Sequence, residues 1–215
     1  MAYIELEKVT KSFKGQEVVR ETTLSFEEGR TYGITGANGS GKTVLMKLIC
    51  GLMVPDSGTI RINGKRLGKD MDFAPNAGII IEAPEFLPYR SGLANLLDMA
   101  KIRNTATKQD VIDAIQAVGL DPNSKKRVGK YSMGMRQRLG IAQAIMEHPE
   151  LLILDEPFNS LDEQGVEDMR KLLLDLKEQG KTILISSHNA EDIDILCDEV
   201  YKMAYGKIAI VGEHK

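Results

Sequence analysis

An eight-residue stretch, Gly36 to Thr43, constrains this chain more than any other. It reads G-A-N-G-S-G-K-T and fits the pattern G-x-x-x-x-G-K-[ST] of the phosphate-binding loop. Residues 31–34 before it predict a short buried strand, and residues 44–50 after it predict a helix that stops at Gly51. This motif needs a strand, a glycine loop and a helix in succession, so the context favours a phosphate site over a chance match.

The chemistry expected of this loop is that of a polyanion site. Its glycines let backbone N–H groups converge on one point, and the following helix adds its positive end. Lys42 brings a full charge to the outer phosphates, and Thr43 offers a hydroxyl to Mg²⁺. The residues expected to bind the nucleotide here are Gly36, Ala37, Asn38, Gly39, Ser40, Gly41, Lys42 and Thr43.

Length and composition narrow the class of protein. The chain has 215 residues, of which 42% are hydrophobic and 27% charged, and a net charge of -3. This profile is typical of one soluble globular domain and argues against a chain built mainly to bind nucleic acid. No apolar run approaches the roughly 18 residues of a membrane span, and the first residues lack a signal-peptide layout. We therefore expect a cytosolic protein, with Cys50 and Cys197 as core thiols.

Hydrophobic periodicity predicts two kinds of structure. Strands are expected over 3–10, 18–26, 31–34, 59–62, 77–81, 151–154, 182–186, 200–204 and 207–211. Residues 91–120 have helical periods, and a further helix opens at Ser132 and runs to about His148. We expect a single α/β unit over residues 1–215, with its core at about 1–83 and 150–215 and a helical insert at about 84–149.

A second cluster of polar residues follows the buried strands. Asp155 and Glu156 end an apolar strand, where a carboxylate faces the ligand crevice of an open α/β sheet. Asp155 would then meet the Mg²⁺ held near Thr43, and Glu156 could accept a proton from an attacking water. His188 also follows a buried strand, unlike His148 and His214, which we expect to be solvated. The alternative for each acid is a solvated turn.

Residues 131–139 allow two interpretations. Ser132 is a good N-cap, and Gly134 permits close backbone approach. A helix beginning there exposes N–H groups and a positive dipole end, which would make a second anion site. An ordinary capped helix with core methionines explains the same residues, and physics alone favours it.

In content and order, these motifs resemble those of the ATP-binding cassette subunits of ABC transporters. The resemblance spans nearly the whole chain. The loop that ends at Thr43 resembles the Walker A motif, and residues 151–156 resemble Walker B with its catalytic glutamate. Residues 160–162, which end in Asp162, resemble the D-loop, and His188 resembles the switch histidine. Phe13 lies where this family places an aromatic side chain that stacks on adenine.

The resemblance implies an ATPase with a P-loop NTPase core of the RecA type, an N-terminal antiparallel β region and an inserted α-helical subdomain. Residues 132–136 resemble the signature motif. In this family two cassettes pair head to tail, so Ser132 and Gly134 would cap the γ-phosphate held by the partner's loop. ATP would close the dimer, and hydrolysis would release it. Implied ligands are ATP and Mg²⁺; implied partners are a second nucleotide-binding subunit and a membrane permease at the inner face of the cell membrane, with no nucleic acid.

Two departures from the family pattern bear on function. The usual signature L-S-G-G-Q is Y-S-M-G-M here, so Met133 and Met135 replace a glycine and the glutamine. Phosphate capping should persist, while the dimer contact changes. Glu82 replaces the Q-loop glutamine, and a carboxylate ligates Mg²⁺ more strongly than an amide but cannot donate a hydrogen bond. We hypothesise that Glu82 senses the metal and signals to the permease through residues 84–93.

Glu82, the following A-P-E-F and the run Y-S-M-G-M-R-Q-R-L-G-I-A resemble the subgroup that exports bacitracin-type peptides and lantibiotics. The favoured function is therefore an ATP-hydrolysing motor subunit for a peptide exporter. One alternative is a soluble ABC-type ATPase acting on nucleic acid or the ribosome, which would usually carry paired cassettes or long coiled-coil insertions. Another is a small P-loop kinase or GTPase, which would need no signature helix; the N-K-x-D motif of a GTPase is absent.

Overall fold

The structure is a computed structural model that describes residues 2–213, so the expectation for His214 lies outside it. Two sheets form its frame. The antiparallel sheet has the order β2-β1-β4-β5 and consists of β1 (Ala2–Phe13), β2 (Gln16–Glu27), β4 (Ser57–Ile62) and β5 (Lys65–Arg66). The second sheet has the order β10-β9-β3-β8-β7-β6 and consists of β3 (Thr31–Thr35), β6 (Ala77–Ile80), β7 (Leu151–Asp155), β8 (Thr182–Ser186), β9 (Glu199–Ala204) and β10 (Lys207–Glu213). All its neighbours are parallel except β10 and β9.

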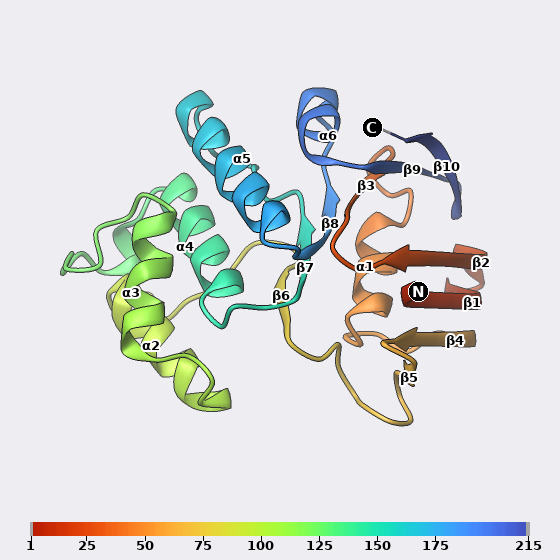
Figure 1. The fold of residues 1–215 in the computed structure, drawn as a ribbon, viewed down its shortest axis with the longest axis horizontal. Coiled ribbons are helices and arrows are strands. Elements are labelled where there is room, and N and C mark those ends of the chain that lie inside the picture. Colours follow the sequence, from red (N-terminus) through yellow and green to blue (C-terminus); the bar gives the residue numbers. More distant parts are fainter. Residues whose placement is uncertain (1, 214–215) are drawn as a thin grey trace.

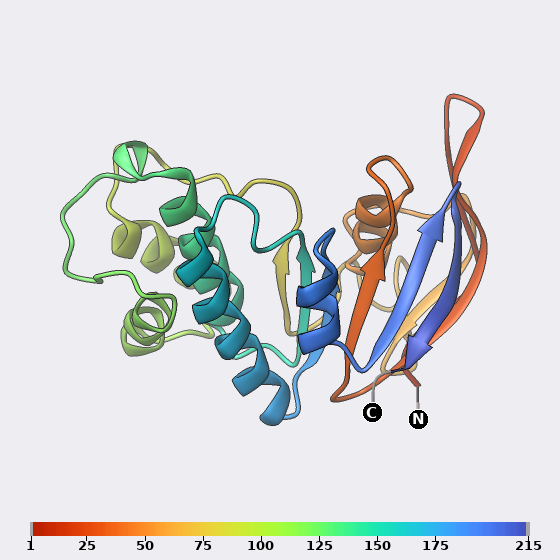
Figure 2. The ribbon, with the colours of Figure 1, turned by 90° about the horizontal axis from the view of Figure 1, so that it is seen from above.

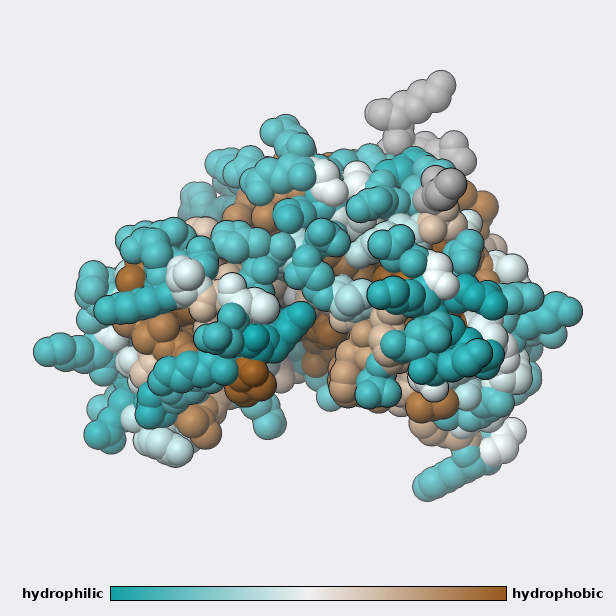
Figure 3. Space-filling model, turned by 60° about the horizontal axis from the view of Figure 1, so that its bottom comes forward, coloured by the Kyte–Doolittle hydropathy of each residue, from teal (hydrophilic) through white to brown (hydrophobic). Residues whose placement is uncertain are grey.

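Within residues 2–213, six α-helices and a short 3-10 helix accompany these sheets. They are α1 (Lys42–Ile49), α2 (Gly92–Arg103), α3 (Lys108–Ala117), η1 (Val128–Lys130), α4 (Met133–Ile145), α5 (Glu163–Glu178) and α6 (Ala190–Leu196). Helices α2, α3 and α4 fall between β6 and β7 in the chain and gather at one end of the molecule, opposite the antiparallel sheet (Figure 1). This arrangement confirms the predicted α/β fold with an antiparallel β region and a helical insert. In the space-filling view, the end with the helical insert and the end with the antiparallel sheet flank a hollow that has apolar residues on both sides (Figure 3).

The parallel strands are buried on both faces, which explains why their sequences lack polar alternation. In β7, Leu151 and Ile153 pack into a core shared with the antiparallel sheet and α1. Leu152 and Leu154 point the other way, into a core shared with α4 and the rest of the insert. In Figure 2, β6 and β7 lie between α1 on one side and α5 with the helical insert on the other.

Helix ends follow the local sequence signals, with one correction. The capping box predicted at Thr107 and Asp110 is present at the start of α3. Helix α4 was expected to reach about His148 but ends at Ile145. His148 adopts a positive φ of 50° and its N–H donates to Ile145 O. This turn ends the helix directly before Pro149, which cannot continue it. The His148 side chain is exposed, as expected, and lies 3.0 Å from Asp110 Oδ1.

The registers of the parallel strands bring three chain segments to one edge. Ile34 pairs with Ser186, and Ser186 pairs with Asp155. The loops after β3, β7 and β8 therefore leave the sheet side by side, at the carboxyl edge where ligands of open α/β sheets bind. Within residues 2–213, no helix is long and apolar enough to span a membrane.

The close approach of α4 to β6 depends on Gly78, and this predicts a large effect of a small substitution. A Cβ at Gly78 would overlap the carbonyl oxygen of Ala144 in α4. We expect Gly78→Ala to lower the free energy of unfolding by about 3 kcal/mol, as overpacking against backbone does. Urea denaturation measures this change.

Gly92→Ala is the matched control. The nearest atoms to its Cβ belong to the side chains of Tyr131 and Leu139, at 2.9 and 3.2 Å, rather than to backbone, and alanine favours helices. We expect a loss below about 1 kcal/mol there. Equal denaturation midpoints for Gly78→Ala and the parent chain would contradict the proposed backbone contact.

Candidate functional site

The loop between β3 and α1 adopts a conformation that only glycine accommodates at several positions. Gly36, Gly39 and Gly41 have φ values of 143°, 77° and 110°. A Cβ at Gly36 would overlap Met203 O, and one at Gly41 would lie 2.6 Å from Val18 O. Helix α1 begins after Gly41 with no side-chain cap, which leaves the N–H groups of its first turn available to an anion.

Two buried polar side chains in this loop fit a bound polyanion. Lys42 is 7% exposed, and its Nζ donates to Gly36 O at 2.8 Å, inside the curve of the loop. The Ser40 hydroxyl is buried and has no hydrogen-bond partner within residues 2–213. A buried orphan hydroxyl is costly, and phosphate oxygens are acceptors that both groups could bind. This observation supports phosphate binding independently of the sequence motif.

Asp155 joins three elements at the edge of the sheet. Thr43 Oγ1 donates to Asp155 Oδ2 at 2.5 Å, and Ser186 Oγ donates to Asp155 Oδ1 at 2.5 Å. Hydroxyl and carboxylate oxygens are ligands that suit Mg²⁺. In the described chain no group of three or more His, Cys, Asp or Glu is placed to hold a metal by itself. Mg²⁺ takes an octahedral set of oxygen ligands, so at Thr43 and Asp155 phosphate or water oxygens would complete its coordination.

Glu156 lies beside this pair in an unusual backbone conformation. Its φ is 50°, and its N–H donates to Ser186 O and Oγ at 3.2 and 2.9 Å. Its Oε2 lies 2.8 Å from Nδ1 of His188, whereas Oε1 is buried without a partner in the described range. One oxygen of Glu156 is thus oriented by His188, and the other is a free acceptor for a donor such as water.

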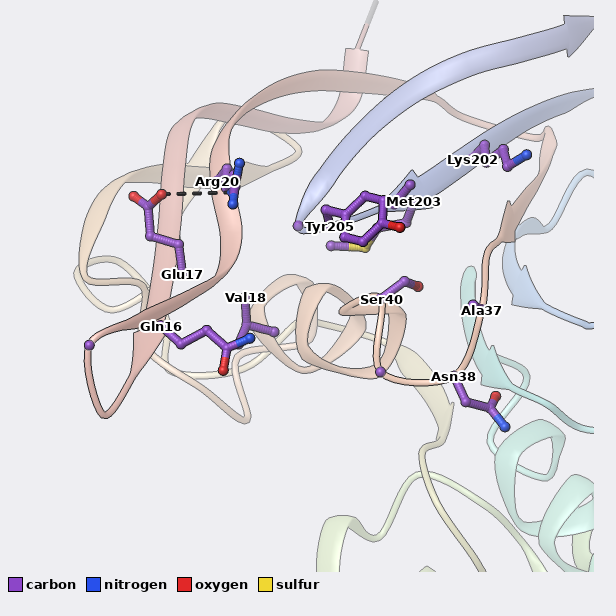
Figure 4. A pocket seen from close by; sticks show the side chains of 14 residues that line it. Gln16, Glu17, Val18, Arg20, Ala37, Asn38, Ser40, Lys202, Met203 and Tyr205 are labelled. Carbon is purple, nitrogen blue, oxygen red and sulfur yellow. Dashed lines mark ion pairs between the residues drawn. The ribbon is translucent and has the colours of Figure 1, made fainter.

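A cavity of about 890 Å³ adjoins the phosphate loop (Figure 4). Its walls come from the start of β2, the loop itself and the turn between β9 and β10; they include Gln16, Val18, Arg20, Asn38, Ser40 and Tyr205. Phe13, predicted to stack on adenine, ends β1 just outside these walls and is 42% exposed, with Lys11 Nζ 5.7 Å from its ring centroid. The cavity is of a size that suits a nucleoside.

Sequence reasoning missed Tyr205, an aromatic residue in that cavity wall. Tyr205 is 88% exposed and lines the cavity from the turn between β9 and β10 (Figure 4). The turn that carries it is fixed to β2, because Arg20 N–H donates to Gly206 O at 2.8 Å. The tyrosine-glycine turn was visible in the sequence, but its place beside the loop follows from the strand order β10-β9-β3, which the sequence does not reveal.

Three further predicted residues lie away from this cavity. Ser132 caps α4, where its hydroxyl accepts the Met135 N–H at 3.1 Å, and Gly134 follows in the first turn. Asp162 caps α5 and accepts the Gly165 N–H at 3.0 Å. None of the three lines the cavities beside the phosphate loop. The structure of one chain therefore brings Thr43, Asp155, Glu156 and His188 together and leaves these residues outside.

Glu82 has a different partner from the predicted one. Its Oε1 lies 2.5 Å from Nζ of Lys47, one turn beyond Thr43 in α1. The structure does not bring Glu82 to Thr43 and Asp155. Glu82 also has a positive φ of 65° and lines a groove of about 230 Å³ between β6 and the insert.

Comparisons with known proteins agree with this geometry. The family model described as ABC transporter matches residues 19–159. The Bacillus subtilis protein named uncharacterized ABC transporter ATP-binding protein YybJ is 44% identical over 95% of this chain and 94% of its own length. The bacitracin transport ATP-binding protein BcrA of Enterococcus faecalis is 41% identical over 95% of this chain and 67% of its own length. A dimeric structure of MJ0796, a bacterial ABC transporter cassette, has the same fold, with a TM-score of 0.87, 21% identity and coverage of 98% and 100% of the two chains.

The cavity predicts a fluorescence response at Tyr205. The chain has no Trp, so Tyr205→Trp introduces a single emitter. We expect its emission to change on titration with ATP and to saturate, because phosphates on the loop place the nucleoside in this cavity. Ile102→Trp, at a position 83% exposed in α2, is the control and should not respond. An unresponsive Tyr205→Trp in a sample that binds ATP would contradict this placement of the nucleoside.

Proposed function

This chain belongs to the ABC transporter family as one of its ATP-binding ATPase subunits, and we propose that it dimerises on ATP and powers a membrane permease that exports a peptide. The observation that carries the catalytic part of this proposal is the cluster at one sheet edge. Thr43, Asp155 and Glu156 converge there, and the Ser40 hydroxyl in the same phosphate loop is buried with no partner among the described residues. This cluster can bind a phosphate ligand, help to hold a divalent ion and supply a proton acceptor.

In the proposed reaction the phosphate loop holds the triphosphate. Lys42 and the N–H groups of the first turn of α1 neutralise its charge. Thr43 and Asp155 would hold Mg²⁺, which offsets the charge that develops on the transferred phosphate. Glu156 accepts a proton from the attacking water, and His188, 2.8 Å from Oε2, keeps the carboxylate oriented toward it.

The dimer is proposed because one chain leaves α4 with an exposed anion-binding end. Ser132 and Gly134 lie outside the cavities of their own loop, and Met133 between them is 66% exposed. The positive end of α4 favours a phosphate, and the exposed apolar side chain at its tip favours contact with a partner protein. The dimeric cassette structure of MJ0796 shows that this fold can pair, and the resemblance of residues 132–136 to the signature motif supports the same pairing here.

The transported substrate is proposed from relatives and sequence. BcrA carries bacitracin transport in its name, and Glu82 and the Y-S-M-G-M run of this chain resemble the features of that subgroup. We therefore propose a peptide antibiotic or a similar compound as the substrate. The permease would contact the groove near Glu82 and the loop over residues 84–93, which would hold the subunit at the inner face of the membrane.

Glu156→Gln separates ATP binding from hydrolysis. The amide keeps the size of the side chain but cannot accept the proton of water, so we expect turnover to fall by about 10²–10⁴-fold. Size-exclusion chromatography should show a dimer with ATP and Mg²⁺ and a monomer without them. Glu163→Gln, an exposed position at the start of α5, is the control and should hydrolyse ATP at the parent rate. Parent-like turnover in Glu156→Gln would refute the assignment of the proton acceptor.

The proposed metal role of Glu82 is tested by the Mg²⁺ dependence of ATP turnover. If its carboxylate leaves Lys47 and meets Mg²⁺ when ATP is bound, Glu82→Ala should raise the Mg²⁺ concentration for half-maximal turnover by about tenfold. Glu82→Gln, which keeps an oxygen ligand, should have a smaller effect. Mg²⁺-dependent ATP affinity, followed with the Tyr205→Trp reporter, gives a readout besides turnover. Unchanged metal dependence in both variants would refute the metal role.

A further inference from the structure

One buried amide joins the helix that carries Ser132 to the loop that carries Glu156. Gln137, in the second turn of α4, is 8% exposed, and its Nε2 donates to Pro157 O at 2.8 Å. Pro157 directly follows Glu156 and is also buried. A buried amide is costly unless it is hydrogen-bonded, so this contact determines where the Gln137 side chain lies.

The loop that Gln137 holds is strained at both ends. Glu156 and Ser160 have φ values of 50° and 68°, in the left-handed region that non-glycine residues rarely adopt. Such conformations persist where the surrounding structure enforces them. Ser186 in β8 accepts a hydrogen bond from the Glu156 N–H. Gln137 in the helical insert donates one to the carbonyl of the next residue, Pro157.

Helix α4 also touches the far end of the same loop. A Cβ at Gly134 would lie 2.8 Å from Ser160 O, so the helix backbone and the loop backbone are in close contact there. Gly134 and Gln137 are three residues apart and therefore lie on one face of α4. The helix thus meets the loop at Ser160 and at Pro157, and a shift of its first turns would move Glu156.

We propose that Gln137 is a positioning residue that couples the two ATP sites of the dimer. The inference rests on the proposed dimer, in which Ser132 of one subunit faces the phosphates of its partner. When α4 is drawn toward the partner's ATP, Gln137 transmits that displacement to Pro157 and aligns the adjacent Glu156 on its own ATP. Each subunit would then hydrolyse ATP efficiently once the other site has closed.

Gln137→Met and Gln137→Glu test the hydrogen bond. Methionine matches the size of glutamine without an N–H, and an ionised glutamate cannot donate to a carbonyl. We expect kcat to fall by about 10–100-fold in both, because a small misplacement of Glu156 is costly. ATP affinity, measured with the Tyr205→Trp reporter, should stay within about twofold, since the phosphate loop is untouched.

Ile141→Val separates positioning from stability. Ile141 is 2% exposed in α4, and losing one methyl group lowers stability while the hydrogen-bonding groups of Gln137 and Pro157 are kept. We expect it to lower the Tm yet keep kcat within about twofold of the parent. If the Gln137 variants keep the parent kcat, or lose no more of it than Ile141→Val at equal Tm, the positioning role is refuted.

The Glu156→Gln background separates this inference from the proposed function. Gln137→Met combined with Glu156→Gln should still form a dimer with ATP, because Ser132 and the phosphate loop remain intact. A dimer in Glu156→Gln together with normal kcat in Gln137→Met would overturn the inference and leave the proposed function standing. Absence of a dimer in Glu156→Gln itself would overturn the proposed function.

Discussion

The hydrogen bond between Thr43 and Asp155 is the contact on which the site depends. Asp155 accepts from Thr43 in α1 and from Ser186 in β8, so one carboxylate at the end of β7 fixes three elements at one point. The in-register parallel strands bring these ends together, and burial on both sheet faces keeps them there. The orientation of Glu156 follows, because Ser186 also binds its N–H.

Much of this site could be predicted from the sequence because strand ends in a parallel sheet converge whatever the details of packing. Asp155, Glu156 and His188 were predicted on that ground and Thr43 from the phosphate-loop motif, and the structure places the four together. Tyr205 could not be predicted, because its position depends on the order of the strands. The contacts of Lys47 with Glu82 and of Gln137 with Pro157 depend on how the insert and the core pack, which periodicity does not encode.

In the proposed dimer, nucleotide chemistry is divided between two parts of the chain. The sheet edge supplies the phosphate loop, the carboxylates and the histidine, while α4 in the insert presents Ser132 to the outside. A composite site formed by two copies would use the sheet edge of one copy and α4 of the other. The buried Gln137 amide links the insert to the loop after Glu156 through its hydrogen bond to Pro157. Membership of the ABC transporter family and the exposed Met133 support the same assembly.

Inter-subunit crosslinking tests the composite site most directly. Asn38→Cys in the exposed phosphate loop and Met133→Cys at the tip of α4 should react with a short bifunctional thiol reagent. Cys50 and Cys197 are buried, and burial raises the pKa of both thiols, that of Cys197 to about 12, so they should contribute little background. A composite site gives a crosslinked dimer with ATP and Mg²⁺ and a monomer without nucleotide. Equal yields with and without ATP, or no crosslink in either state, would contradict it.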